Sequence, residues 1–361
     1  MEKIRVGVVG SGKAAGMHAD GIVNIKNASL VAVQSRSKER GEAFAGKYGA
    51  KAYQDIADMV SAEKLDMVTV CSPHPNHLEA VEAAMSQGAH VLVEKPLAST
   101  LEDCDAMIAA SKKYGKKLGM VSQRRILPAS QRIRKAIDAG KVGTPALGIA
   151  QLLGWRGEEY YKSNPWRGSW EHEGGGVLVN QAPHQIDLLQ WYMGGEMESL
   201  YGVWNNINHP YIEVDDTAVA IIKFKGGGIA NLILSNSQKP GLYGKVHIHG
   251  SNGASVGVQT DGGAMFIAGI SKVQEPPKTD LWTVPGEEGL VAQWEKEDVD
   301  LFHREDPIEY FIRAQNQDFV DAIINDRPPM VDGKEGRKTV EIFTAIYRSM
   351  KEGKEIKWPL I

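Results

Sequence analysis

The chain has 361 residues, of which 42% are hydrophobic and 24% charged, and its formal net charge is −4. A chain of this length is too long to fold around one ordinary hydrophobic core, so we expect two domains. The charge provides no general attraction to nucleic acids or anionic membranes, and no apolar stretch reaches the roughly 20 residues that span a bilayer. The two cysteines make neither a disulfide framework nor a zinc cluster. The chain leads directly into an apolar strand without room for a signal peptide, so we expect a cytoplasmic protein with no nucleic-acid or membrane partner.

Short apolar strands alternate with helical stretches through residues 1–123. The apolar runs are continuous, as expected for strands that are buried on both faces. This alternation predicts an α/β domain with a doubly wound parallel sheet. Strands are expected at 4–9, 30–34, 67–71, 90–94 and 118–121, and helices at 17–24, 38–48, 77–87 and 101–114.

A second domain of α+β class is expected at 124–361, with a large, open and mainly antiparallel sheet. Its strands are expected at 145–153, 217–224, 228–234 and 245–250, and its helices at 177–193, 306–325 and 334–351. Gly226-Gly227-Gly228 would form the hairpin turn between the second and third of these strands. The last helix is a candidate to pack back toward the first domain. An open sheet face is often covered by another subunit, so we expect a homo-oligomer: a dimer, a tetramer or a larger assembly.

A glycine turn, Gly10-Ser11-Gly12-Lys13-Ala14-Ala15-Gly16, lies between the first predicted strand and the first helix. Gly10 allows the tight turn, and Gly12 lets the backbone approach a pyrophosphate. Ala15 or Gly16 keeps helix and strand close, and N–H groups at the helix start can hold phosphate oxygens. In this strand–turn–helix context the motif predicts a Rossmann dinucleotide-binding domain.

The end of the second strand bears on the choice between NAD and NADP. NAD-specific sites usually place a carboxylate there for the ribose 2′-hydroxyl, whereas an arginine accommodates a 2′-phosphate. The sequence has Gln34-Ser35-Arg36-Ser37, with no acid. Arg36 and two hydroxyls suit a phosphate, so the cofactor is expected to be NAD(P), with NADP favoured over NAD by a small margin. The alternative is that Arg36 stacks on the adenine.

Three further segments, together with the glycine turn, resemble the Gfo/Idh/MocA family of glucose–fructose oxidoreductases, inositol dehydrogenases and rhizopine catabolism proteins. They are Cys71-Ser72-Pro73-His74-Pro75-Asn76-His77, Glu94-Lys95-Pro96, and the run from Gly174 to Asp187 that contains Asn180 and His184. The ending, with Asp326-Arg327-Pro328-Pro329 and Asp332-Gly333, also fits. The match spans nearly the whole chain in the right order.

The resemblance implies reversible hydride transfer between a nicotinamide and a secondary hydroxyl of a sugar, cyclitol or glycoside. It also implies that Lys95 and His184 lie beside the reacting carbon and that the Lys95–Pro96 bond is cis. The residues expected to contact the cofactor are Gly10, Gly12, Lys13, Ala14, Ala15, Ser35, Arg36, Ser72, Pro73, Asn76, His77, Glu94, Lys95 and Gln123.

Alcohol oxidation needs a group that takes the hydroxyl proton, with a pKa near neutrality. Histidine has such a pKa without tuning, so we favour His184 as the acid/base. Lys95 would orient the hydroxyl and stabilise the alkoxide. Asn180 stands where many family members carry Asp, which puts an Asp–His relay in doubt. Asn180 would share a helix face with His184 and would hydrogen-bond a substrate hydroxyl, so it completes the candidate catalytic set.

Aromatic walls with polar partners suit sugars, which present apolar C–H faces and polar edges. The substrate-binding residues expected on this basis and from the resemblance are Lys95, Arg125, Trp155, Tyr160, Trp166, Arg167, Asn180, His184 and Asp187. Asp187 could orient the His184 ring, bind a hydroxyl or only anchor its helix. His247 and His249 lack a third ligand, so no metal site is expected.

Two other functions remain open at this stage. One is a glycosidase-type enzyme that uses bound NAD to oxidise a sugar hydroxyl transiently, usually at C3, before eliminating the aglycone. The other is a non-catalytic sensor that binds a dinucleotide and a protein partner. Lys95, His184 and Asn180 would serve both a dehydrogenase and a glycosidase-type enzyme, so the sequence does not distinguish these two activities.

Overall fold

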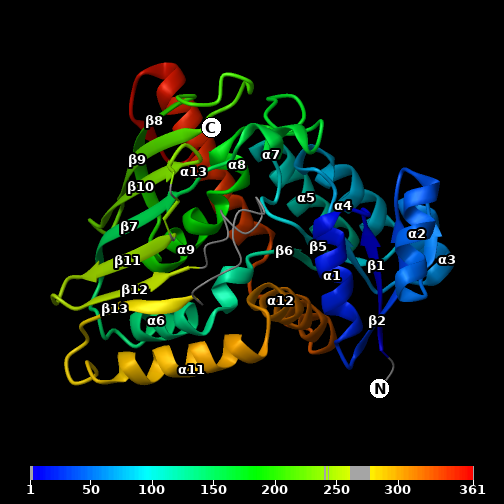
Figure 1. Cartoon of the computed structure of the whole chain (residues 1–361), viewed down its shortest axis with the longest axis horizontal. Helices are drawn as coiled ribbons and strands as arrows, with labels where there is room; N and C mark the ends of the chain where they lie inside the picture. The colour runs from blue at the N-terminus through cyan, green and yellow to red at the C-terminus, as the bar shows by residue number, and fades with distance from the viewer. Residues whose placement is uncertain (1–2, 240, 243, 261–276, 361) are drawn as a thin grey trace. The chain divides into compact units, whose positions relative to one another are not determined.

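The computed structural model describes residues 3–239, 241–242, 244–260 and 277–360. The chain divides into two compact units, shown in Figure 1. The first comprises Met1–Gln123 and Asp306–Arg337, and the second comprises Arg124–Glu305 and Lys338–Ile361.

The first unit contains a six-stranded sheet with the order β3-β2-β1-β4-β5-β6, in which every pair is parallel. The strand order reverses at β1, which is the arrangement of a doubly wound Rossmann sheet, as the sequence predicts. The strands are β1 (Ile4–Val9), β2 (Ala28–Gln34), β3 (Lys51–Tyr53), β4 (Met67–Val70), β5 (His90–Val93) and β6 (Leu118–Met120). The three-residue β3 was not predicted, because its burial pattern has no fully buried position.

The helices of this unit are α1 (Lys13–Val23), α2 (Lys38–Tyr48), α3 (Ile56–Glu63), α4 (His77–Ser86), α5 (Leu101–Tyr114) and α12 (Pro307–Ile324). Helix α12 corresponds to the helix that the sequence analysis assigned to the second domain. It packs on α1, where Gly21 permits close approach: a Cβ at Gly21 would lie 3.2 Å from the Arg313 Cα. The glycine at this position therefore lets α12 lie close to α1.

The second unit contains an eight-stranded sheet with the order β13-β12-β11-β7-β10-β9-β8-β14. Only β7 and β10 pair in parallel among its described strands, so the sheet is mixed and mainly antiparallel. The strands are β7 (Pro145–Leu153), β8 (Met197–Asn205), β9 (Thr217–Phe224), β10 (Ile229–Ser235), β11 (Lys245–Gly250), β12 (Ser255–Gln259), β13 (Lys278–Trp282) and β14 (Ile356–Lys357). The predicted glycine hairpin joins β9 and β10, with Gly227 at φ +86°.

One face of this sheet carries the core of the second unit. Helix α9 packs on β7 and β11, and α8 on β9 and β10. Alternate residues of β9 are buried, while Val219 and Ile221 are exposed. The helices are α6 (Pro128–Asp138), α7 (Glu158–Lys162), α8 (Val177–Asn180), α9 (Pro183–Met193), α11 (Leu290–Arg304) and α13 (Gly333–Glu352), the last of which runs from the first unit into the second.

The single helix predicted over residues 177–193 is wrong, because α8 ends at Asn180 and α9 begins at Pro183. Proline has no N–H to donate within a helix. The Ala182 N–H donates to the Val177 carbonyl at 2.9 Å, five residues back, which is the wide spacing of a π-turn. The four-residue spacing predicts that Asn180 and His184 are neighbours on one helix face. Because they lie on two separate helices, this prediction is wrong.

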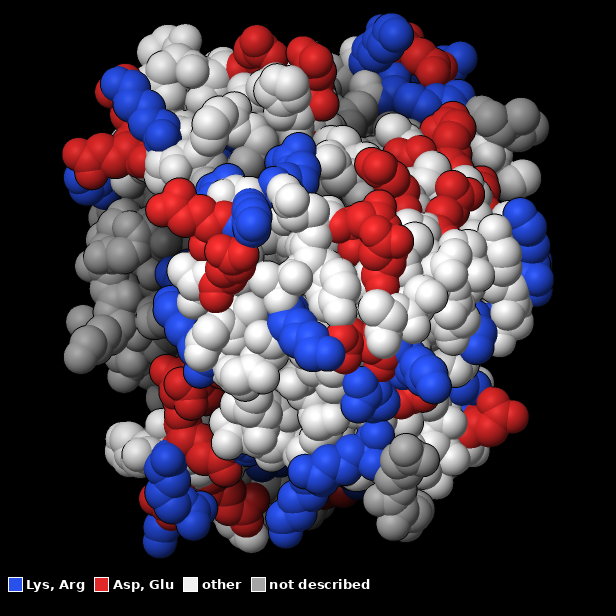
Figure 2. All heavy atoms as spheres, turned by 90° about the vertical axis from the view of Figure 1, so that its right-hand side faces the viewer, with Lys and Arg blue, Asp and Glu red and all other residues white. Residues whose placement is uncertain are grey.

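No helix among the described residues is long and apolar enough to cross a membrane. On the face shown in Figure 2, Lys and Arg side chains are interspersed with Asp and Glu side chains. That face therefore carries no broad patch of a single charge.

Candidate active-site residues

The glycine turn has the geometry that a pyrophosphate requires. Gly10 lies at φ +110°, and a Cβ there would come within 3.1 Å of the Cys71 carbonyl oxygen. Gly12 is the N-cap of α1, no side chain caps that helix, and the space beside the Gly12 Cα is open. The helix begins at Lys13, four residues before the predicted start. Its first N–H groups thus directly follow the turn, where they can bind phosphate oxygens.

Two other predicted cofactor residues carry buried polar atoms that suit a ligand. Ser72 follows β4, and Gln123 opens a short 3₁₀ helix after β6. The Ser72 Oγ and the Gln123 Oε1 are buried, and neither has a hydrogen-bond partner among the described residues. Both lie in the first unit beyond the carboxyl ends of parallel strands, where dinucleotides bind such sheets. The first unit therefore fits the predicted cofactor.

At the end of β2, the hydroxyls of Ser35 and Ser37 have partners within the protein, whereas Arg36 is exposed. The Ser35 hydroxyl contacts that of Ser11 at 3.0 Å, and Ser37 caps α2 by accepting from the Arg40 N–H. Arg36 is exposed. Since both hydroxyls are engaged within the protein, Arg36 carries the case for a 2′-phosphate.

His77, predicted to contact the cofactor, is fully buried. Its Nε2 lies 3.0 Å from the Ser72 carbonyl oxygen, and its Nδ1 lies 3.1 Å from that of Leu97. Burial lowers the pKa of His77, and a neutral ring donates to one of these carbonyls at a time. His77 thus joins the turn after β4 to the loop after β5, which places it behind the cofactor-binding turn as a positioning residue.

The Glu94-Lys95-Pro96 turn is held by a buried polar chain that the sequence did not reveal. Asn316 of α12 donates to the His18 Nδ1 at 2.8 Å, so the ring hydrogen lies on Nε2 and is donated to the Glu94 Oε1 at 3.0 Å. The other Glu94 oxygen accepts the Lys95 backbone N–H at 3.0 Å. Burial tends to raise the pKa of Glu94, but the hydrogen bond from His18 and the charge of Lys95 outweigh it, so this pKa lies below its ordinary value.

This chain connects α1 and α12 to the backbone of Lys95, whose bond to Pro96 is cis as the resemblance implies. His18 and Asn316 lie 298 positions apart in the sequence, so no local signal could have paired them. The backbone at the candidate catalytic lysine is therefore connected to the returning helix through Glu94 and His18.

In the second unit, Asn180 and His184 are both 9% exposed. The Asn180 Nδ2 donates to the Glu173 Oε1, and the other Glu173 oxygen accepts the Gly168 N–H at 2.6 Å. Glu173 is 1% exposed, and burial raises its pKa to about 7. The sequence analysis missed this carboxylate; its one signal was an acid directly before the Gly174-Gly175-Gly176 run.

Arg125 and Asp187, both predicted to bind substrate, bind each other. The Arg125 Nε and Nη2 each lie 2.7 Å from an Asp187 carboxylate oxygen, and both residues are 1% exposed. The Arg125 guanidinium also lies 4.9 Å from the Trp191 ring centroid. Of the roles considered for Asp187, this geometry supports the anchoring of α9 to the segment before α6.

The predicted aromatic loop does gather around one ring. The Arg167 guanidinium carbon lies 4.0 Å from the centre of the Tyr160 ring and 4.7 Å from that of Trp166. The Tyr160 hydroxyl accepts from the Gln181 amide at 2.9 Å and lies 3.4 Å from the Asn180 Nδ2. Tyr160, Arg167 and Asn180 are therefore close together, although they come from three different segments.

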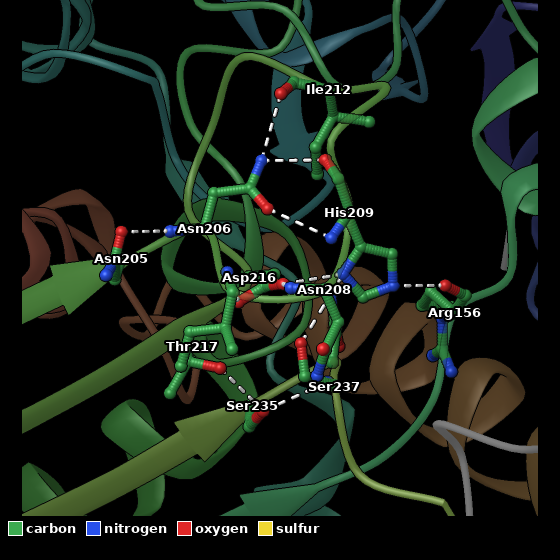
Figure 3. A network of polar contacts seen from close by, with 12 residues as sticks. Arg156, Asn205, Asn206, Asn208, His209, Ile212, Asp216, Thr217, Ser235 and Ser237 are labelled. Carbon is green, nitrogen blue, oxygen red and sulfur yellow. Dashed lines mark hydrogen bonds and ion pairs between the residues drawn. The ribbon is translucent and has the colours of Figure 1, made fainter.

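Trp155 packs instead on a polar network between β8 and β9, which Figure 3 shows. His209 lies at its centre: its Nδ1 contacts Asp216 at 2.7 Å and its Nε2 contacts the Arg156 carbonyl at 2.6 Å. Burial opposes ionisation of Asp216, but hydrogen bonds from His209 and its other donors hold its pKa well below the ordinary value. The network fixes the backbone of the aromatic loop at Arg156. No group of three or more potential metal ligands occurs among the described residues.

Comparisons with known proteins agree with the fold class that the sequence predicts. The profile described as "Oxidoreductase family, NAD-binding Rossmann fold" matches residues 4–122, and that described as "GFO/IDH/MocA C-terminal domain" matches residues 130–256. A myo-inositol 2-dehydrogenase of Thermotoga maritima is 25% identical over 98% of both chains. An inositol 2-dehydrogenase of Rubrobacter xylanophilus is 30% identical, over 55% of each chain.

A solved structure is also similar over the full length. It is the WlbA dehydrogenase of Bordetella pertussis in complex with NADH and UDP-GlcNAcA, which is 27% identical, with a TM-score of 0.87, over 100% of this chain and 99% of that one. The similarity therefore includes both units.

Proposed function

Because the chain belongs to the Gfo/Idh/MocA family of NAD-binding oxidoreductases, we propose that it oxidises a secondary hydroxyl of a sugar, cyclitol or glycoside and reduces the ketone in the reverse direction. The observation that carries the proposal is that Lys95 stands in a turn held by a buried His18–Glu94 pair. The names of the relatives, which include inositol dehydrogenases, support this substrate class.

In the proposed reaction, His184, Lys95 and Asn180 have separate roles. His184 takes the hydroxyl proton during oxidation and returns it during reduction. Lys95 orients the hydroxyl and stabilises the alkoxide, because a cation favours developing negative charge. Asn180 hydrogen-bonds a neighbouring hydroxyl through an amide whose Nδ2 end is held by Glu173. The nicotinamide supplies the hydride acceptor when bound.

The proposed cofactor is NAD(P), with NADP favoured over NAD. The support is the absence of a carboxylate in Gln34-Ser35-Arg36-Ser37 and the exposure of Arg36. Gly10, Gly12 and the first N–H groups of α1, at Lys13, Ala14 and Ala15, would hold the pyrophosphate.

The proposed oligomer forms through the open face of the eight-stranded sheet. Exposed apolar side chains form rows across its strands: Tyr201 pairs with Ile221, and Val203 and Ile233 flank Val219. An apolar patch of this kind on a globular protein is typical of an interaction site, and a two-fold axis would bring the same patch of a second copy onto it.

The test is to follow nicotinamide absorbance with sugars, cyclitols and glycosides for the wild type and a Lys95→Ala, His184→Ala double variant. The wild type should form a ketone with net NAD(P)H production, and the variant should lose at least about 10³-fold in rate. Cleavage of a glycoside without net NAD(P)H would instead establish the transient-oxidation enzyme. Full biological activity of the double variant would establish the sensor.

A further inference from the structure

Two arginines of the second unit carry buried N–H groups that lack acceptors. Arg156 is 1% exposed, and its Nε has no hydrogen-bond partner in the described part of the chain; the same holds for the Nε and Nη1 of Arg167. The Arg156 Nη1 does donate to the Trp155 carbonyl at 3.1 Å. A buried donor without an acceptor loses its hydration without replacement, and the loss is larger for a charged group. Arg156 and Arg167 therefore keep buried N–H groups that could bind an acceptor from a ligand.

Both guanidinium groups lie on the same tyrosine. Their central carbons are 5.1 Å (Arg156) and 4.0 Å (Arg167) from the centroid of the Tyr160 ring. The Tyr160 hydroxyl in turn contacts the amides of Asn180 and Gln181. The two cations are thus one side chain away from Asn180, which the proposed function assigns to the substrate.

The surrounding acids leave this cluster positively charged. Glu173 interacts electrostatically with Arg167, but burial raises the pKa of Glu173 to about 7, so it is only partly ionised near neutral pH. Asp215 is occupied by the N–H groups of Gly176 and Leu178 and by the Tyr347 hydroxyl. Asp216 is paired with His209.

Tyr161 also faces the cluster, and burial raises its pKa, so it stays uncharged. Burial and the charge of Arg167 act together to lower the pKa of Arg156. Two cations held close together at partly buried positions are stabilised by an anion, and guanidinium groups suit the planar or tetrahedral oxygens of carboxylates and phosphates.

We infer that Arg156 and Arg167 bind an oxyanion group, a carboxylate or a phosphate, carried by the saccharide substrate. This inference rests on the proposed function and narrows it from neutral sugars to acidic ones. The anionic group binds at the Tyr160 ring, and a hydroxyl of the same molecule binds at Asn180. The energy of the ion pairs is available for orientation because the guanidinium groups are already fixed against aromatic rings.

The experiment measures calorimetric binding of glucuronate, glucose 6-phosphate and glucose to the full-length protein saturated with NADH or NADPH, so that no oxidation occurs. At least one of the two anionic sugars should bind about tenfold or more tightly than glucose. Which of them does so distinguishes a carboxylate from a phosphate. Arg167→Met should weaken binding of the preferred anionic sugar at least about tenfold more than it weakens binding of glucose, because only the anionic sugar forms charge-assisted bonds with the guanidinium group.

Arg348→Met is the matched control, since it removes one arginine from helix α13 that pairs with Glu352 at the surface. It should keep the anion preference. Arg156→Met is the second variant and should also reduce the preference for the anionic sugar. Thermal unfolding checks that each variant is folded. Equal affinity for glucose and for both anionic sugars, or an equal loss of all three in Arg167→Met, would overturn the inference.

The two proposals fail in different ways. Oxidation of neutral sugars with no gain from an anionic group would overturn the oxyanion site and leave the proposed dehydrogenase standing. If an anionic sugar bound in an arginine-dependent way but no substrate of the panel were oxidised, the proposed dehydrogenase would be overturned. The oxyanion site would still stand.

Discussion

Asn180 donates its side-chain amide to the carboxylate of Glu173, and this contact fixes which end of the amide is the donor toward the protein. Glu173 accepts a second hydrogen bond from the Gly168 backbone N–H, so each carboxylate oxygen has its own donor. Both bonds require acceptors, and a carboxylate is the one side-chain group of this shape that accepts at both ends. Glu173 is therefore suited to hold Asn180, although its burial disfavours the charge.

The first prediction concerns Glu173→Gln. A glutamine keeps the shape but turns one acceptor into a donor, so the bond to Gly168 or to Asn180 is lost. Loss of one hydrogen bond to a charged group corresponds to about 1.5–3 kcal/mol, and KM for the substrate should rise by roughly 10- to 100-fold. The measurement is steady-state kinetics at pH 8, where the wild-type carboxylate is ionised.

The pH dependence gives a second readout. The pKa of Glu173 is raised to about 7, so the wild-type KM should increase as pH falls through 7 and the carboxylate gains a proton. Glu173→Gln should lack this increase. The free energy of unfolding should change with pH in the opposite direction to substrate affinity. A carboxyl group whose pKa is raised in the folded protein stabilises the fold while it is protonated, and this stabilisation is lost as pH rises through 7. Relative to the variant, the wild type should therefore be less stable at pH 8 than at pH 5. A variant with the same KM profile as the wild type would contradict the positioning role.

The second prediction concerns His18→Leu. This change removes the donor to the Glu94 Oε1 and one of the two acceptors of the Asn316 amide, at a cost of about 1–3 kcal/mol in the free energy of unfolding. It also releases the turn that carries Lys95, so kcat should fall more than KM rises. Urea unfolding and steady-state kinetics measure the two effects.

A double-mutant cycle with Asn316→Leu is the control for His18. The two residues share a hydrogen bond, so the double variant should lose less than the sum of the single variants. Additive losses would show that His18 and Asn316 act independently. An unchanged kcat in His18→Leu would remove the link to Lys95.

The third prediction separates anchoring from substrate binding at Asp187. Removing one partner of a fully buried ion pair is strongly destabilising, so Asp187→Asn should lower the free energy of unfolding by about 3–5 kcal/mol. The double variant Arg125→Met, Asp187→Leu should recover part of this loss, since it leaves no unpaired charge. If Asp187→Asn were as stable as the wild type but bound substrate poorly, Asp187 would be a substrate ligand instead.

The fourth prediction concerns Arg36 and the cofactor. Arg36→Ala should reduce kcat/KM for NADP by about tenfold or more, because a charge-assisted contact to a 2′-phosphate is lost, and should change the value for NAD little. Lys38→Ala, which removes an exposed charge two residues away, is the matched control. Equal effects of Arg36→Ala on both cofactors would favour adenine stacking.

The fifth prediction concerns the open sheet. Ile221 is 54% exposed at the centre of the apolar rows, so Ile221→Glu should disrupt an assembly that buries this face. Sedimentation velocity should show the wild type as an oligomer and the variant in a smaller form. Lys38→Glu, at an exposed position of α2 in the first unit, should assemble as the wild type does. A monomeric wild type would contradict the proposal.

Much of the first unit could be predicted because its signals are local. Continuous apolar runs and glycine spacing identify buried parallel strands and the turn of a dinucleotide site within about 20 residues of sequence. The candidate residues Lys95 and His184 came instead from the resemblance of two short motifs to a known family, and their roles stay predictions. The sequence analysis missed the break before Pro183, because the apolar run was interpreted as one helix without considering the missing proline N–H.

What the sequence by itself determined is the fold class, the nucleotide-binding turn and the chemical types of the candidate catalytic groups, because these depend on residue identity and short spacing. Only the tertiary structure decided that Asp187 is bound by Arg125, that His18 joins Asn316 to Glu94, and that Glu173 holds Asn180. Such pairings depend on burial and on contacts between distant segments. A charged side chain is identical in sequence whether it meets a substrate or its own buried counter-ion.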